Sequence, residues 1–156
     1  MTAYCSYLNS PPYYLDQTST VDAIRDFQVF INRYPTSSRV PRANELIDQL
    51  RLKLEEKYYR ISLLYLQMEE YKAAIVSFQN LMKDYPDTKF REEAMYYIVE
   101  AWYKYAEKSI PEKRIERHQA AIDAFNDFKA QYPESRYLQN AQNLIKNSYK
   151  IAKIKI

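Results

Sequence analysis

His118 is the first candidate for acid–base chemistry, because histidine has the unperturbed pKa nearest neutrality and the chain has a single histidine. A zinc site usually needs several histidines or cysteines, and the single cysteine is Cys5. When the repeats described below are aligned, His118 takes the position of Tyr71 in one copy and of Thr20 in another. That position packs one helix against the next, so we expect His118 to be structural.

Three pairs of neighbouring carboxylates are the other candidates. Neighbours in a helix point about 100° apart, so we expect solvated surface and not a general acid facing a general base. The chain has no glycine for the sharp turn beneath a serine nucleophile, and we expect Cys5 to fill a small space in the core. The sequence predicts no catalytic residue, no metal and no cofactor, and therefore no enzyme. The pairs are Glu55 with Glu56, Glu69 with Glu70 and Glu92 with Glu93.

The composition favours a helical binding protein. The 156 residues are 47% hydrophobic and 28% charged, as in an ordinary globular domain. Without glycine, tight β-hairpins and phosphate-binding loops are hard to build. The net charge of +3 is small and evenly spread, so we expect no nucleic-acid binding. The 17 tyrosines suit helix contacts and binding surfaces, because the ring packs while the hydroxyl reaches water.

Apolar periodicity predicts one long helix over residues 39–68. After a short break at Glu69 and Glu70, a second helix starts at Tyr71 and stops at Tyr85-Pro86. A single apolar stripe must be covered, so we expect the two helices to form a hairpin that stacks on its neighbours. The stripe of the long helix, which Lys57 interrupts, consists of Ala43, Ile47, Leu50, Leu54, Ile61, Leu64 and Met68.

A motif recurs three times with identical internal spacing. Each copy contains an Ala-Ile pair, two further apolar positions, a Tyr-Pro pair, a hydroxyl residue and an alanine. The proline ends the helix at the tyrosine, and we expect the hydroxyl to accept hydrogen bonds from amides of the next helix. The copies are Ala23-Ile24, Phe27, Phe30, Tyr34-Pro35, Ser37 and Ala43; Ala74-Ile75, Phe78, Leu81, Tyr85-Pro86, Thr88 and Ala94; and Ala121-Ile122, Phe125, Phe128, Tyr132-Pro133, Ser135 and Ala141.

The remaining segments complete a series of helices. We expect helices over residues 2–9, from a cap at Ser19 or Thr20 to residue 34, over 89–108, from a capping box at Ser109 to about 131, and over 136–153. The helix over 89–108 has two apolar faces and should lie between neighbours. We predict one all-α solenoid domain over residues 1–156, with hairpins over about 2–35, 37–86 and 88–133 and a capping helix over 136–153.

The segment over residues 58–86 resembles a tetratricopeptide repeat, with Ser62 in the place of the usual small glycine. Together with the long helix and the Tyr-Pro turns, it makes the chain resemble the C-terminal repeats of the BamD-like outer-membrane assembly lipoprotein family over nearly its whole length. The resemblance implies a tetratricopeptide-type α-solenoid of antiparallel hairpins with one extra-long helix. The matching positions are Tyr58, Ile61, Tyr65, Tyr71, Ala74, Phe78, Leu81 and Pro86.

The resemblance also implies a function. Members of that family are non-catalytic scaffolds at the periplasmic face of the outer membrane, and their C-terminal repeats dock onto the periplasmic domains of the barrel-forming assembly subunit. The implied partners are that subunit and other assembly lipoproteins. Membrane attachment in the family uses a lipid anchor, which we expect to lie outside this chain. The chain starts at a methionine within a predicted helix, so we expect it to be a fragment of a longer protein.

Stacked hairpins leave a concave surface lined by the first helix of each pair. We predict protein contacts on the solvent-facing strip of the helix over 89–108 and at the turn before it, because arginine and tyrosine dominate interface energetics. The predicted protein-binding residues are Lys89, Arg91, Glu93, Tyr96, Glu100 and Lys104.

Two alternative functions stay open at this point. One is a periplasmic repeat adaptor of the cell-envelope division or Tol system, whose repeats share the Ala-Ile and Tyr-Pro signatures but have shorter helices. The other is an accessory repeat domain of an enzyme.

Overall fold

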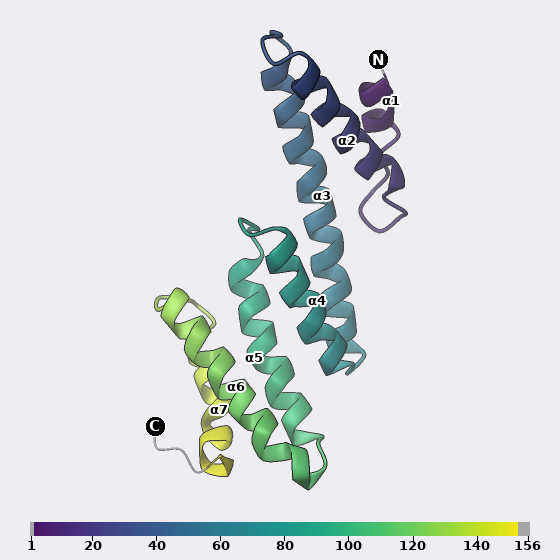
Figure 1. The fold of residues 1–156 in the computed structure, drawn as a ribbon. Coiled ribbons are helices and arrows are strands. Elements are labelled where there is room, and N and C mark those ends of the chain that lie inside the picture. Colours follow the sequence, from purple (N-terminus) through teal and green to yellow (C-terminus); the bar gives the residue numbers. More distant parts are fainter. Residues whose placement is uncertain (1, 153–156) are drawn as a thin grey trace. The chain divides into compact units, whose positions relative to one another are not determined.

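The computed structural model describes residues 2–152, and every regular element in that range is an α-helix (Figure 1). The all-α fold predicted from the sequence is confirmed. The helix bounds agree with the prediction to about two residues, and the predicted end at residue 153 lies outside the described residues. The helices are α1 (Thr2–Leu8), α2 (Thr18–Arg33), α3 (Val40–Gln67), α4 (Tyr71–Asp84), α5 (Arg91–Glu107), α6 (Pro111–Gln131) and α7 (Leu138–Ile151).

The chain divides into two compact units. Unit 1 covers Met1–Lys57 and unit 2 covers Tyr58–Ile156. The boundary falls within α3, so the first part of this helix belongs to unit 1 and the second part to unit 2. The single domain over residues 1–156 stays a prediction.

In unit 1, α1, α2 and the first part of α3 pack around a small apolar core. Ala23 and Phe27 of α2 are buried against Ala43 and Leu50 of α3. Tyr7 of α1 meets Phe27 edge-on, with ring centroids 6.5 Å apart. Ala23 and Phe27 of α2 therefore lie at the centre of this unit.

The start of α2 differs from the prediction. We expected Ser19 or Thr20 to cap the helix, but α2 begins at Thr18 and Thr20 is fully buried inside it. Its hydroxyl donates to Gln17 Oε1 (2.7 Å), and Gln17 Nε2 donates to Pro12 O (2.8 Å). A buried glutamine thus ties the preceding loop to the helix, a role that helix-capping preferences do not reveal.

In unit 2, α5 lies between α4 and α6 and also contacts α7 (Figure 1). Ala94, Ile98 and Ala101 belong to the core that α5 shares with α4. Met95 and Val99 belong to the core that it shares with α6 and α7. The prediction that this helix has two buried faces is confirmed.

The second part of α3 approaches α4 closely. Ser62 is fully buried, and its hydroxyl shares a hydrogen bond of 2.7 Å with the hydroxyl of Ser77 on α4. It also donates to the Tyr58 carbonyl within α3 (2.8 Å). A small side chain is needed here for the two helices to come together.

The three Tyr-Pro turns share one geometry. Each tyrosine has φ between −133° and −130° and ψ between 61° and 77°, outside the helical region. Ser37, Thr88 and Ser135 accept from the amide two residues further on, at 3.3, 3.3 and 3.1 Å. The predicted acceptor role is confirmed, but the donor amides lie in the turn just before each helix and not inside it.

The chain leaves α3 without a glycine. Glu69 has φ of 61°, the left-handed region that glycine usually occupies after a helix. Glu70 N donates to Tyr65 O (2.9 Å) and closes the turn. A side chain in this region costs roughly 1–2 kcal/mol, so the turn carries local strain.

The predicted apolar stripe of α3 is correct in its first half and wrong in its second. Leu64 is 52% exposed and Met68 61% exposed, whereas Tyr59, Ser62 and Leu66 are buried in unit 2. A pattern with a seven-residue period drifts by about 20° per heptad around a straight α-helix. Over a helix of 28 residues this drift moves the far end of the stripe away from α4.

Three local predictions are wrong. Cys5 is exposed on α1 and does not fill the core. Glu55 is buried on α3 and is not solvated. Ser109 does not cap α6, since the residue at the cap is Ile110 and the Ser109 hydroxyl donates to the Tyr105 carbonyl.

Candidate functional site

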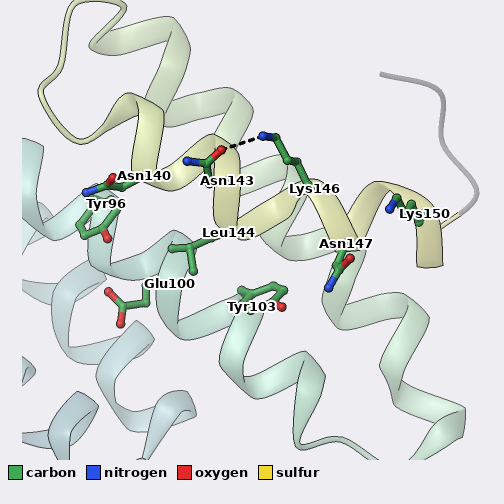
Figure 2. A pocket seen from close by; sticks show the side chains of 9 residues that line it. All are labelled: Tyr96, Glu100, Tyr103, Asn140, Asn143, Leu144, Lys146, Asn147 and Lys150. Atoms are coloured by element: carbon green, nitrogen blue, oxygen red, sulfur yellow. Dashed lines mark hydrogen bonds between the residues drawn. The ribbon is translucent and has the colours of Figure 1, made fainter.

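An open groove of about 680 Å³ lies between side chains of α5 and α7 in unit 2 (Figure 2). Side chains of α5 form one wall, and side chains of α7 form the other. The α5 wall consists of Tyr96, Glu100 and Tyr103, and the α7 wall of Asn140, Asn143, Leu144, Lys146, Asn147 and Lys150.

The two walls differ in chemistry. The α5 wall carries two phenols and a carboxylate, and Glu100 Oε1 is paired with Lys104 Nζ at 2.5 Å. Tyr96 stacks on Tyr137 with ring centroids 4.9 Å apart, and burial raises the pKa of the Tyr96 phenol. The α7 wall is rich in neutral amides and carries basic side chains. The groove can therefore form hydrogen bonds along its length and attract negative charge at its α7 rim.

The structure gives the six predicted contact residues different environments. Tyr96 and Glu100 line the groove, and Lys104 lies beside it as the partner of Glu100. Lys89 lies at the turn before α5 with its Nζ 5.0 Å from the Phe90 ring centroid. Arg91, at the start of α5, donates to the carbonyl of Pro86 (3.3 Å). Protein binding by these residues stays a prediction.

The remaining predicted residue, Glu93, has internal partners. Its Oε2 accepts from the Tyr59 hydroxyl (2.5 Å), and its Oε1 accepts from the Tyr137 hydroxyl (2.7 Å) and Arg136 Nη2 (2.9 Å). These hydrogen bonds, the one from Tyr59 above all, lower the pKa of Glu93. We call Glu93 with Tyr59, Arg136 and Tyr137 the Glu93 cluster. It joins α3, α5 and the turn before α7, and so holds the Tyr96 end of the groove.

A second polar cluster lies at the other end of α5. His118 is fully buried on α6; its Nδ1 shares a hydrogen bond of 2.9 Å with Ser148 Oγ of α7, and its Nε2 lies 3.2 Å from Glu107 Oε1. Burial lowers the pKa of His118, and Arg114 adds to this, while Glu107 opposes it. We call His118 with Glu107, Arg114 and Ser148 the His118 cluster. The prediction that His118 occupies a packing position is confirmed.

The His118 cluster contains the residue types of a hydrolytic triad. The His118 ring lies 2.9 Å from Ser148 Oγ on one side and 3.2 Å from Glu107 Oε1 on the other. A nucleophile must reach its substrate, and both Ser148 and His118 have no exposed surface. The arrangement instead joins α5, α6 and α7 behind the groove.

Sequence reasoning missed the α7 wall. The asparagines at 140, 143 and 147 are spaced by three and four residues, which places them on one face of a helix. That spacing was a readable signal, but asparagine is also common on solvated surfaces. Only the position of α7 beside Tyr96 and Tyr103 marks these amides as the wall of a groove.

Among residues 2–152, no group of three His, Cys, Asp or Glu side chains could hold a metal ion. Within the same residues, no helix has the length and apolar character needed to cross a membrane.

Comparison with known proteins identifies a family. The chain has no match among curated proteins. Residues 1–117, from α1 into the beginning of α6, match the family YfiO, described as outer membrane lipoprotein. This match covers well over half of the chain. The protein therefore belongs to the YfiO family of outer membrane lipoproteins.

Proposed function

We propose that this protein is a non-catalytic scaffold of outer-membrane β-barrel assembly and docks the periplasmic domains of the barrel-forming subunit. The observation that carries the proposal is the match of residues 1–117 to the outer membrane lipoprotein family. The resemblance to BamD-like proteins supplies the finer role and the location at the periplasmic face of the outer membrane.

The packing of unit 2 supports a binding role. Its helices form successive antiparallel hairpins, and α5 is covered on two faces. Tetratricopeptide-type hairpins bury each other's apolar faces and leave a continuous surface for partners. The buried Ser62 and the Tyr-Pro turns fit that repeat type.

The surface that we propose for docking is the side of α5 that carries Arg91, Tyr96, Glu100 and Lys104, with Lys89 at the turn before it. Tyr96 is held by its stack on Tyr137, so a partner would meet an ordered ring. We propose that Glu93 orders this surface through its internal hydrogen bonds.

Charge reversal tests this surface. The double variant Arg91→Glu with Glu100→Lys should capture the periplasmic domains of the barrel subunit at least about tenfold more weakly, because interface charges are reversed, while helical circular dichroism is unchanged. The matched control exchanges two exposed charges of α6, Asp127→Lys with Lys129→Glu. Normal capture by the first variant would exclude the proposed surface.

A further inference from the structure

We propose that the groove between α5 and α7 binds an extended, acidic segment of a partner polypeptide, whose backbone is held by the asparagines of α7. The inference deepens the proposed scaffold function and rests on it, since it names the kind of segment that this part of the scaffold takes. The α7 wall lies beyond residues 1–117, the part of the chain that matches the family.

The amides of α7 fit a peptide backbone. An asparagine side chain offers both a donor and an acceptor, as each peptide unit does. Asn140 and Asn147 are exposed and form no hydrogen bond with another described side chain. They are separated by about 10 Å along the axis, because a helix rises 1.5 Å per residue. Three residues of an extended chain span about the same distance.

Figure 2 shows how the wall is divided. Leu144 points from α7 toward Glu100 and Tyr103, with Asn140 near Tyr96 at one end. Asn143, nearer the rim of the groove, accepts a hydrogen bond from Lys146 Nζ (2.8 Å). The inner side thus offers amides and apolar atoms, and the rim offers positive charge.

The charges at the rim select an acidic segment. Lys146 and Lys150 are exposed, and neither pairs with a carboxylate among residues 2–152. The carboxylate of the opposite wall, Glu100, already pairs with Lys104. Side chains of an extended chain alternate between two sides. Side chains on one side of the bound segment can therefore enter the groove. Acidic side chains on its other side can pair with Lys146 and Lys150.

A membrane surface is a poorer fit. Membrane-binding helices insert an exposed apolar face between lipids. The apolar face of α7 includes Ala141 and Ile145, which are fully buried against α5 and α6. The groove contributes only Leu144 as an aliphatic side chain.

Fluorescence anisotropy with synthetic peptides and the full chain tests the inference. The probe is a short labelled peptide of alternating Glu and Thr, which favours an extended conformation. We expect it to bind at least about tenfold more tightly than the matching peptide of alternating Lys and Thr. A Glu-Thr peptide with N-methylated backbone amides should also bind about tenfold more weakly, because it cannot donate to the asparagine oxygens. Equal binding of the normal and N-methylated peptides would overturn the proposed backbone recognition.

Variants of α7 locate the site. Asn140→Ala with Asn147→Ala should weaken Glu-Thr binding about tenfold, and Lys146→Glu with Lys150→Glu should remove the preference for the acidic peptide. The matched controls on α6, Asn126→Ala and Lys129→Glu, change exposed residues away from the groove and should bind normally. Unchanged binding by the double asparagine variant would overturn the inference.

Two further measurements separate this inference from the proposed function and from lipid binding. Capture of the folded periplasmic domains of the barrel subunit tests the scaffold function directly, so normal capture without Glu-Thr binding would reject the inference alone. Loss of capture with intact Glu-Thr binding would reject the docking role and leave peptide recognition standing.

Vesicles with anionic lipids test for a membrane ligand, and we expect the protein not to bind them. Vesicle binding that is lost in Lys146→Glu with Lys150→Glu would overturn the choice of a peptide.

Discussion

The two ends of α5 are held by polar clusters that work in different ways. In the Glu93 cluster, a partly exposed carboxylate stays ionised because two phenols and Arg136 donate to it. In the His118 cluster, burial of the imidazole lowers its pKa and so disfavours its charged form. The ring lies between Ser148 Oγ and Glu107 Oε1. One end therefore depends on a charge and the other on the absence of a charge.

This difference predicts how the groove is stabilised. Both clusters fix α7 against α5, one near Tyr96 and the other behind Tyr103. Truncation of a fully buried group leaves a cavity and unpaired polar atoms, whereas exposed partners are replaced by water. We therefore expect the His118 end to be the more sensitive to substitution and the first to weaken on acidification.

The largest effect is expected from His118→Ala. The change leaves a cavity and removes the partner of the buried Ser148 hydroxyl, so the free energy of unfolding should fall by about 3 kcal/mol. Urea denaturation followed by circular dichroism measures it. Lys129→Ala, at an exposed position of the same helix, should leave the midpoint unchanged. A loss for His118→Ala no larger than that of Glu93→Ala would contradict the comparison.

A smaller effect is expected from Glu93→Ala. The variant leaves the buried Tyr59 hydroxyl without its acceptor, so the free energy of unfolding should fall by about 2 kcal/mol. Glu93→Gln keeps an acceptor and should recover part of the loss. The exposed Glu134 provides the control, since Glu134→Ala should have no measurable effect in the same urea titration.

The pH dependence of stability should separate the two ends. The pKa of His118 is lowered in the fold from its ordinary value of 6.5, so below that pH the unfolded chain takes up the proton first and stability falls. The pKa of Glu93 is lowered from 4.5, so its contribution is complete above that pH and is lost as the pH falls through the folded value.

Urea midpoints measured between about pH 7.5 and pH 2.5 test both windows. His118→Gln should flatten the decline that starts near pH 6.5, and Glu93→Gln should flatten only the decline below pH 4.5. Identical slopes for His118→Gln and the unmodified chain near neutrality would show that another group titrates there.

The smallest effect is expected from Arg136→Ala. Arg136 is largely exposed, and its pair with Glu93 lies at the surface, where ion pairs contribute little. The urea midpoint should therefore match that of the unmodified chain. A large destabilisation would mean that the charge pair, and not the phenols, holds the Glu93 cluster.

The fold could be predicted from the sequence because its signals are local. Each Tyr-Pro pair removes an amide donor and fixes the backbone at one place, so helix ends near Tyr34, Tyr85 and Tyr132 follow directly. The two apolar faces of α5 were equally readable. Periodicity failed in the second half of α3, where small errors in angle accumulate along a straight helix.

The site was harder to predict because it depends on contacts between distant residues. Glu93 looks like surface on α5 until Tyr59 and Tyr137 are placed around it. Asn140 and Asn147 look like a solvated face of α7 until that helix lies beside α5. A single sequence carries the spacing within each helix but not the pairing of one helix face with another.

Site-specific photo-crosslinking tests the scaffold role most directly. A photoreactive amino acid replaces Tyr96 in the groove or Asn126 on α6, and the protein is irradiated in cells that contain the barrel-forming subunit. We expect a crosslink to that subunit from position 96 and none from position 126. Equal crosslinking from both positions, or none from position 96 with the protein folded and present in normal amount, would contradict the proposed scaffold role.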